Sequence, residues 1–368
     1  MHDVVIVGAG LYGATFAHLA RKRGLSVLVI DKRDHIAGNA FTKNVDGIHQ
    51  HVYGAHIFHT NNHTIWQFVN QFGVFDQFQL NVKAQSDKLY SLPFNMNTFY
   101  EMWGCKRPSE AQQIIASQTL KLNREPRNLE EHALSQVGHD IYERLIYAYT
   151  KRQWGCEPST LPASIIKRLP LRFEYNNNYF NDVYQGIPRD GYTQIVENML
   201  DGCEVELGVD YFKNRTVWDT AKILVYTGPI DRFFNFEYGR LPYRSLEFEH
   251  HLVPLTASQG TAVINNCTSG MKHTRTIEHR YFMHDCRSSN SLVTLEYSLH
   301  THPEAEPFYP INTDENQEIF RKYKQSAVKL PNTIIGGRLG EYRYYDMHQV
   351  IASAMADFSR FFDANSTL

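Results

Sequence analysis

Apolar and polar positions at the start of the chain follow a simple order. β-Branched residues dominate two short apolar runs, residues 4–7 and 27–30, and a stretch with helical spacing lies between them. Such runs are typical of buried strands, so the pattern predicts strand, helix, strand. Because a helix connects the two strands, they are expected to lie parallel in a sheet that has helices on its faces.

Helical spacing dominates the middle of the chain. Apolar residues recur every three or four positions in residues 64–72, 109–121, 128–137 and 138–150. An inserted helical domain, residues 96–185, is the simplest interpretation of the last three stretches. It includes a polar loop, residues 151–158, that contains Trp154. A large apolar side chain in such a loop suits either a mobile lid or an anchor that holds the loop to its own domain.

Short alternating runs replace this spacing later in the chain, as in residues 261–265 and 291–297. A period of two predicts an antiparallel sheet. The chain then ends with a strand at 332–335, a glycine-rich turn at 336–340 and a helix that begins at Asp346, which is a suitable N-cap residue.

These patterns together predict an α/β protein with a Rossmann-like domain, an inserted helical domain and an antiparallel β-sheet domain. The Rossmann-like domain is expected to comprise residues 1–80, 186–230 and 311–368. The helical domain is expected over residues 96–185 and includes the lid loop. The sheet domain is expected to comprise residues 81–95 and 231–310.

Composition and charge narrow the class of protein. The 368 residues carry a formal net charge of −2, which favours neither nucleic acid nor a membrane surface as a partner. No apolar run approaches the ~20 residues of a transmembrane helix, and the first strand begins too close to Met1 for a signal peptide. The five cysteines include no CxxC pair, which suits reduced thiols. A cytoplasmic protein without membrane insertion or nucleic-acid binding is expected.

The turn after the first strand carries the first functional motif. Gly8, Gly10 and Gly13 have the spacing GxGxxG, and Asp31 ends the second strand. In such a unit the glycines serve the tight turn, the approach of a pyrophosphate and helix packing, and the acid accepts hydrogen bonds from a ribose. Dinucleotide binding is therefore predicted. Asp31 would repel an NADP 2′-phosphate, but it does not distinguish NAD from FAD.

Two later segments favour FAD. Gly38 lies in a polar segment just after Asp31, where it would let the backbone approach a ligand, although a plain surface loop fits the same pattern. The second glycine-rich turn, residues 336–340, leads to a second helix N-terminus. FAD is long enough to use both turns, with the amides of the second helix facing the negatively charged edge of a reduced flavin.

Histidines are concentrated between residues 49 and 63, at His49, His51, His56, His59 and His63. Their spacing allows a metal site. No cysteine or carboxylate accompanies them as a further ligand, so histidines that bind a cofactor or the backbone are the preferred interpretation, and no metal site is predicted.

Arginine and tyrosine occur close together in several segments. Arg168 and Arg172 precede Tyr179, while Arg275 and Tyr309 lie in the region of short strands. Arginine forms bidentate contacts with phosphate, and a tyrosine hydroxyl can donate to a phosphate oxygen. Each arginine taken alone would more often be a solvated surface residue.

Several long motifs together resemble UDP-galactopyranose mutase of the bacterial type, over essentially the whole chain. They are residues 7–10, 31–40, 54–60, 92–95, 151–155, 178–186 and 337–347. The resemblance implies an FAD-dependent isomerase, typically a cytoplasmic homodimer, that interconverts UDP-galactopyranose and UDP-galactofuranose. It also implies that N5 of the reduced flavin is the nucleophile at the anomeric carbon, that UDP is the leaving group, and that there is no net redox change.

The resemblance also assigns roles to individual residues. It places Arg168 and Arg275 on the diphosphate, and it prefers Arg168 to the nearby Arg172 because of its spacing from Trp154. Asp346 would lie near the sugar and the flavin, and with the two arginines it forms the expected catalytic set. The remaining expected substrate contacts are Tyr149 on uracil, Trp154 in the lid, and the hydroxyls of Tyr179, Tyr309 and Tyr344. The remaining expected cofactor contacts are Gly8, Gly10, Gly13, Asp31, Gly38, Asn39, His56, Arg338 and Met347.

The sequence departs from the family pattern in one small respect: it has Asp31 where relatives often carry glutamate.

Two other functions remain open from the residues alone. A flavin oxidase of a small amine-type substrate would use the same kind of FAD domain, but it would have little use for arginines and tyrosines around a diphosphate. A non-catalytic flavin- or nucleotide-binding module would show no turnover.

Overall fold

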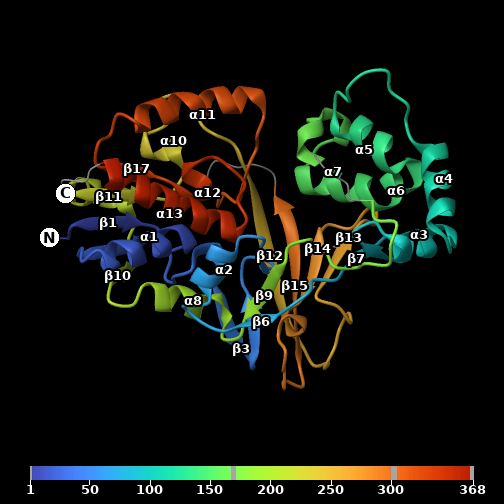
Figure 1. The fold of residues 1–368 in the computed structure, drawn as a ribbon, viewed down its shortest axis with the longest axis horizontal. Coiled ribbons are helices and arrows are strands. Elements are labelled where there is room, and N and C mark those ends of the chain that lie inside the picture. The colour runs from blue at the N-terminus through green and yellow to red at the C-terminus, as the bar shows by residue number, and fades with distance from the viewer. Residues whose placement is uncertain (1, 167–170, 300–304, 365–368) are drawn as a thin grey trace.

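A computed structural model describes residues 2–166, 171–299 and 305–364. Its first part is a parallel five-stranded sheet in the order β10-β2-β1-β11-β17. The strands are β1 (Val4–Val7), β2 (Val27–Asp31), β10 (Glu204–Leu207), β11 (Ile223–Tyr226) and β17 (Thr333–Ile335). Helices α1 (Leu11–Lys22) and α13 (Met347–Ala364) pack together beside this sheet, and both termini lie at the same end of the molecule (Figure 1).

The core of this part follows from the apolar runs. Val4, Ile6 and Val29 are buried, and Phe16 of α1 meets Phe358 of α13 with 5.2 Å between the ring centroids. Since both faces of the sheet are covered, its strands can be continuously apolar. The predicted strand, helix, strand unit is confirmed.

The second part is a seven-stranded sheet in the order β16-β12-β15-β14-β13-β7-β8. Its strands are β7 (Val82–Gln85), β8 (Leu89–Leu92), β12 (Tyr243–Val253), β13 (Val263–Asn266), β14 (Arg275–Glu278), β15 (Ser291–Leu299) and β16 (Tyr309–Pro310). Every pair is antiparallel except β13 with β7, which is parallel. The predicted fold class, an α/β protein with Rossmann-like, helical and antiparallel-sheet parts, is confirmed.

The third part is helical and lies on the far side of the seven-stranded sheet from the Rossmann-like part (Figure 1). Its helices are α3 (Met96–Trp103), α4 (Pro108–Gln118), α5 (Leu129–Val137), α6 (His139–Ile141) and α7 (Ala148–Trp154), and a π-helical turn, Tyr142–Tyr147, joins the last two. The expectation of a loop from residue 151 is wrong, because α7 continues to Trp154. Lys151, Arg152 and Gln153 favour a helix, and Gly155, with φ +69°, supplies the left-handed residue that ends it.

Smaller elements connect these parts. The further strands are β3 (Thr42–Val45), β4 (Ile48–His51), β5 (Phe58–Thr60), β6 (Phe75–Gln77) and β9 (Tyr184–Pro188). The further helices are α2 (His63–Val69), α8 (Gly191–Met199), α9 (Arg215–Trp218), α10 (Ile230–Phe233), α11 (Asp314–Ala327) and α12 (Gly337–Gly340). No helix in the described ranges is long and apolar enough to cross a membrane.

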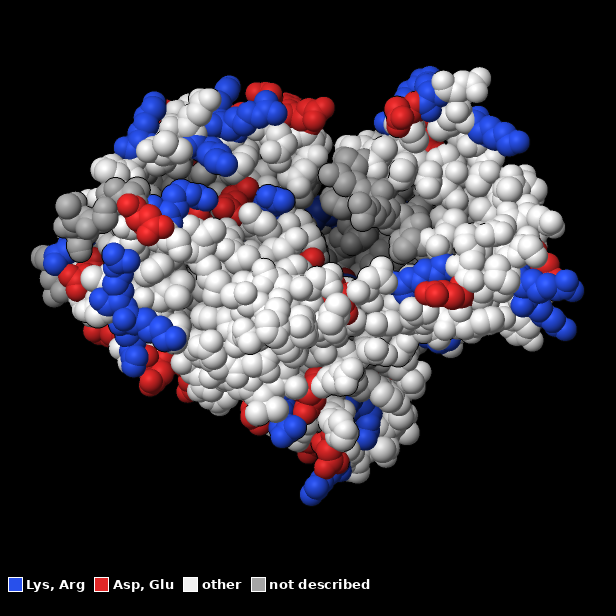
Figure 2. All heavy atoms as spheres, in the orientation of Figure 1, with Lys and Arg blue, Asp and Glu red and all other residues white. Residues whose placement is uncertain are grey.

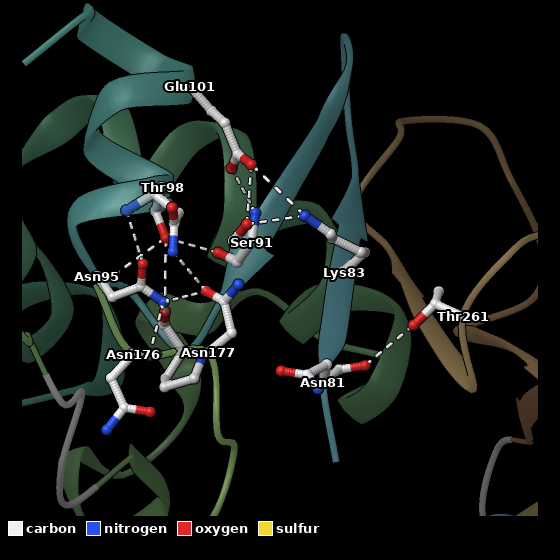
Figure 3. Close-up of polar contacts among 11 residues, drawn as sticks. Asn81, Lys83, Ser91, Asn95, Thr98, Glu101, Asn176, Asn177 and Thr261 are labelled. Atoms are coloured by element: carbon white, nitrogen blue, oxygen red, sulfur yellow. Dashed lines mark hydrogen bonds and ion pairs between the residues drawn. The ribbon is translucent and has the colours of Figure 1, made fainter. Parts of the chain in front are cut away.

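Partly buried polar contacts fix the helical part to the edge of the seven-stranded sheet (Figure 3). Glu101 of α3 accepts hydrogen bonds from the Ser91 amide and hydroxyl of β8. Asn95, which caps α3, donates from Nδ2 to the Asn176 carbonyl and to Oδ1 of Asn177. The segment that leads into Tyr179 is thereby held against the start of α3.

Candidate functional site

A cavity of about 1230 Å³ lies where the three parts meet, and it is lined by residues from each of them. Figure 2 shows the surface hollowed between the Rossmann-like lobe and the helical lobe. A pocket for one small ligand usually has about 300–1,000 Å³. The cavity therefore has room for a cofactor and a second ligand.

The glycine turn between β1 and α1 forms one end of this cavity. Gly8, Gly10 and Gly38 line the wall. A Cβ on Gly38 would lie 3.1 Å from Cα of Gly10, which is closer than ordinary van der Waals contact, so the two backbone segments approach each other more closely than a side chain here would allow without a shift. Gly13 does not line the cavity, since its hydrogen atoms pack against the Gly8 carbonyl, only 2.0 Å from where a Cβ would be. The turn thus presents bare backbone at a helix N-terminus, which suits a pyrophosphate.

Asp31 also lines the cavity, at the end of β2. Its Oδ2 accepts a hydrogen bond from the Ala9 amide at 2.8 Å, and its Oδ1 accepts one from the Arg33 amide at 2.9 Å. Each carboxylate oxygen has a second lone pair that can accept from a ribose hydroxyl. Asp31 therefore shapes the glycine turn in addition to its expected role. Asn39 lies nearby in the same wall, with its Oδ1 held by Arg33.

The second glycine segment faces the cavity from the other side. Residues 337–340, expected as a turn, form the short helix α12, and Arg338 lies 5.7 Å from the centre of the Tyr309 ring. The helix α13 follows, with Asp346 and Met347 in the cavity wall. The Asp346 carbonyl accepts the Val350 amide at 3.0 Å, so free amides of the first turn lie at the cavity. Such an end favours the negatively charged edge of a ligand.

His56 lines the cavity as a neutral imidazole of defined tautomer. Its Nδ1 donates to the Gly54 carbonyl at 2.7 Å, which leaves Nε2 as an acceptor toward a ligand. Burial lowers the pKa of His56 to about 4, and Arg338 and Arg275 act in the same direction. His56 can therefore accept a hydrogen bond from a cofactor at neutral pH.

A chain of histidines supports His56 from behind. The His56 amide donates to Nδ1 of His51, the His51 amide donates to Nδ1 of His279, and Nε2 of His279 donates to Thr294. His279 lies more than two hundred positions from His51, and no sequence signal marked it. His51 and His56 both bind backbone groups, as the sequence analysis expects, while cofactor binding by His56 stays a prediction.

The other histidines of the cluster do not gather around one point. His63 contacts the Tyr184 hydroxyl at 2.9 Å, whereas His59 contacts Asp182 at 2.7 Å. His59 does lie near Asp346 and His348, with one possible ligand atom of each within 4.8 Å of the others. This group belongs to the wall where the second glycine segment meets the cavity.

Burial of His279 should make the folded protein less stable in acid. Burial lowers its pKa from 6.5 to about 3. Above pH 6.5 the histidine is neutral in both states, and between pH 6.5 and 3 only the unfolded chain binds the proton. Stability is therefore lost as the pH falls through this window, by about 2 kcal/mol at pH 5. Urea unfolding at pH 7.5 and pH 5 should show a smaller decline for His279→Gln than for the wild type, and an equal decline would contradict the assignment.

Arg275 forms the charged centre of the cavity. Its Nε and Nη2 donate to the two carboxylate oxygens of Glu296, at 2.8 and 2.6 Å, and Glu296 is only 3% exposed. Burial alone would lower the pKa of Arg275, but Glu296 and the Tyr149 and Tyr309 hydroxyls outweigh it and raise this pKa. The arginine therefore stays cationic and fixed inside the cavity. Its Nη1 is not one of the two nitrogens that donate to Glu296.

Four tyrosines line the cavity with Arg275. The Tyr309 and Tyr344 rings lie 5.6 Å apart. Tyr179 is 40% exposed and Tyr344 is 53% exposed, and both face the cavity, while Tyr149 is less exposed. A cation surrounded by phenol hydroxyls can bind a diphosphate. These residues come from four different parts of the sequence, and the structure brings all four expected tyrosines together with Arg275.

Two arginines near residue 170, Arg168 and Arg172, are candidates for the diphosphate. Arg168 lies outside the described residues. Arg172 donates to the Asn178 carbonyl and, at 2.5 Å, to Oδ1 of Asn181. Arg172 thus braces the loop that carries Tyr179, and the choice of Arg168 for the diphosphate stays a prediction.

Trp154 does not lie in the described cavity wall. The carbonyl of the preceding residue, Gln153, accepts hydrogen bonds from Nη2 of Arg244 at 2.8 Å and from the Ser298 hydroxyl at 2.6 Å. Arg244 is a buried strand residue that sequence patterns could not distinguish from a surface arginine. It anchors the end of α7 to the seven-stranded sheet.

Comparison with known proteins agrees with this geometry. A family model described as UDP-galactopyranose mutase matches residues 144–344, and a model of an NAD(P)-binding Rossmann-like domain matches residues 6–72. A probable UDP-galactopyranose mutase of Klebsiella pneumoniae is 39% identical, over 98% of this chain and 94% of the relative. A dTDP-fucopyranose mutase of Escherichia coli is 38% identical, over 96% and 97%.

The fold is similar to that of a solved structure as well. A crystal structure of reduced UDP-galactopyranose mutase superimposes with a TM-score of 0.76 and 13% identity, and the match covers 99% of this chain and 96% of the other. At this identity the likeness concerns the fold alone.

Proposed function

Because this chain belongs to the UDP-galactopyranose mutase family, we propose that it interconverts UDP-galactopyranose and UDP-galactofuranose with a reduced FAD. One observation carries the proposal. A single cavity has the bare glycine turn of a dinucleotide site at one end and Arg275 among four tyrosines at the other. A cofactor and a nucleotide diphosphate can therefore meet inside it.

FAD fits the cofactor end better than NAD. The close approach of Gly10 and Gly38 leaves space for a pyrophosphate beside the N-terminus of α1. The N-terminus of α13 lies at the same cavity, with Arg338 and His56 in the wall to meet the flavin half. In its reduced form FAD would supply a nucleophilic nitrogen at the anomeric carbon, so the reaction needs no nucleophile from the protein and no net redox change.

The protein's own residues would act on the leaving group. As the bond to the anomeric carbon breaks, negative charge grows on the diphosphate of UDP. Arg275 stays charged because Glu296 holds it, and the hydroxyls of Tyr309 and Tyr344 can donate to the same oxygens. Groups fixed before the reaction stabilise such charge without rearranging. Tyr149 would stack on uracil, and Asp346 would lie between the sugar and the flavin.

A direct assay tests this function. Purified holoenzyme reduced with dithionite and mixed with UDP-galactofuranose is expected to form UDP-galactopyranose, detected by chromatography, and the oxidised enzyme is expected to be inactive. No product with reduced enzyme would reject the mutase function. Oxygen consumption with a small amine would support the oxidase instead, although the cavity's arginine and tyrosines would then have no evident task.

We further propose a cytoplasmic homodimer and a lid role for Trp154. Trp154 ends α7, next to the Gln153 carbonyl that Arg244 holds to the sheet. If a nucleotide binds between this helix and Arg275, the indole ring of Trp154 would close over it.

Removing the Trp154 ring should weaken UDP binding. Trp154→Ala is expected to raise the Kd for UDP by about tenfold, because a large aromatic contact is lost. Titration calorimetry of the oxidised enzyme measures this change, and Trp154→Phe, which keeps a ring, should lose less. An unchanged Kd would show that Trp154 only anchors its helix.

Relatives of nearly equal similarity are named for different sugar nucleotides, UDP-galactopyranose and dTDP-fucopyranose. Both names describe a mutase of a nucleotide-linked pyranose, so family membership alone leaves the preferred sugar nucleotide open.

A further inference from the structure

The segment that follows Asp31 is tied to the seven-stranded sheet by one carboxylate. Lys32 and Arg33 come directly after β2, and Glu306 lies just before β16. Nζ of Lys32 donates to Oε2 of Glu306 at 2.7 Å, and Nη2 of Arg33 donates to Oε1 at 3.0 Å. Lys32, Arg33 and Glu306 thus form a clasp between the Rossmann-like part and the sheet, although Glu306 lies 274 and 273 positions after its two partners in the chain.

The clasp closes the cavity at its rim. Lys32, Arg33 and Glu306 all line the cavity. Since they belong to different walls, these walls meet where the ion pairs form. The side chains of Lys32 and Glu306 are 46% and 36% exposed, whereas that of Arg33 is 16% exposed. Groups that face both the cavity and the solvent mark the boundary between the two, so the clasp forms part of the cavity's edge.

Neighbouring contacts fix the clasp on both sides. Nη2 of Arg33 also donates to Oδ1 of Asn39 at 2.9 Å, and the guanidinium lies 4.4 Å from the centre of the Tyr53 ring. On the sheet side, the Ser245 hydroxyl of β12 donates to the Glu306 carbonyl at 2.8 Å. An isolated exposed ion pair contributes little to stability, but several charges held in one geometry can contribute as a network. The clasp therefore has the geometry to hold the two walls together.

The clasp lies beside the expected ADP half of the cofactor. Asp31, which would bind the ribose, directly precedes its two cations in the chain. Asn39, the partner of Arg33, follows Gly38, whose backbone approaches Gly10 of the glycine turn. The part of the rim that the clasp closes thus runs from the expected ribose position toward the expected pyrophosphate position.

On the premise of the proposed function, in which the cavity holds FAD, we propose that the clasp retains the cofactor. Glu306 holds Lys32 and Arg33 across the rim and thereby slows the dissociation of FAD. The ADP half leaves past the rim beside Asp31, and the ion pairs have to open for this to happen. Glu306 is thus a positioning residue that acts through its two cations and needs no contact with FAD.

The sign of the effect separates this role from simple electrostatics. FAD carries a negatively charged pyrophosphate, so a carboxylate that only lies nearby would repel it. Removal of that charge would then slow the release of FAD. A clasp predicts the opposite result, because Lys32 and Arg33 lose the partner that holds them across the rim and the cavity opens more often.

Release of FAD from the holoprotein tests the clasp without any assay of turnover. Glu306→Gln keeps the shape of the side chain and removes its charge. It is expected to raise the rate of FAD dissociation by about fivefold to tenfold, because two ion pairs are lost. The rise in flavin fluorescence after dilution of the holoprotein measures this rate. An increase of about threefold or more supports the proposal, and a smaller increase, no change or a decrease overturns it.

Glu131→Gln is the matched control. Glu131 accepts hydrogen bonds from Nη1 and Nη2 of Arg124, at 2.7 and 2.8 Å, and neither residue lines the cavity. This variant should release FAD at the wild-type rate, and an equal increase in both variants would reject the clasp. If Glu306→Gln does not fold, Glu306→Asp replaces it, since its side chain keeps the charge but is too short to hold both cations in this geometry.

The outcomes also separate the clasp from the proposed function. A wild-type protein that binds no FAD would reject the proposed cofactor and the clasp together. A protein that binds and releases FAD but lacks mutase activity would reject only the mutase function, because the release rate can still be measured in all variants.

Discussion

Replacement of Arg275 by alanine is expected to lower kcat by about a hundredfold to a thousandfold and to leave FAD bound. The guanidinium lies among Tyr149, Tyr309 and Tyr344, where it would meet the charge that grows on the departing diphosphate. The glycine turn that would hold the pyrophosphate of the cofactor is formed by other segments. Steady-state assays of the reduced enzyme measure kcat, and the absorbance spectrum reports the flavin content.

The control must separate lost charge from damage to the fold. Removal of Arg275 leaves the carboxylate of Glu296 buried without its partner, which by itself is destabilising. Arg275→Met combined with Glu296→Gln removes this unpaired charge, and it should be as inactive as the alanine variant but more stable to heat. Loss of flavin in the double variant, or recovery of turnover, would contradict a leaving-group role for Arg275.

A valine at Gly10 is expected to weaken FAD binding by about a hundredfold or more, close to 2.7 kcal/mol, while the apoprotein stays folded. A Cβ at this position would meet only Cα of Gly38, at 3.8 Å, which is ordinary contact. The additional methyl groups would project where a pyrophosphate must approach the backbone. Flavin content after purification and titration of the apoprotein with FAD measure the effect.

Lys22→Val is the matched control, since it adds the same β-branched residue at the exposed end of the same helix. It should bind FAD as the wild type does, and circular dichroism should show both variants folded. Full flavin content in Gly10→Val would mean that the pyrophosphate does not lie at this turn.

Local patterns were sufficient for most elements of the fold. The apolar runs at 4–7 and 27–30 form β1 and β2 because such residues are stable only when both faces of a sheet are covered. Local patterns placed the end of one helix wrongly, at residue 150. The polarity of Lys151, Arg152 and Gln153 predicts a loop, but their helix preference lets α7 continue to Trp154.

Long-range contacts determined what local patterns could not. Nothing near Arg244 indicates that it holds the Gln153 carbonyl, and nothing near His279 indicates that it supports His51 and, through it, His56. In each case the partners are about ninety or more than two hundred positions apart in the chain. A pairing of this kind depends on how separate elements dock, which no single segment encodes.

The sequence by itself determined the strand, glycine turn, helix and strand at the start of the chain, and a dinucleotide site is predicted from them. Gly8 has φ +112°, a conformation that glycine permits, so the shape of this turn could be inferred without any neighbour. Only the tertiary structure decided that Glu296 fixes Arg275, which pairs with it across β14 and β15. The physical reason is strand register, because a slip of one residue turns every side chain of a strand to the opposite face.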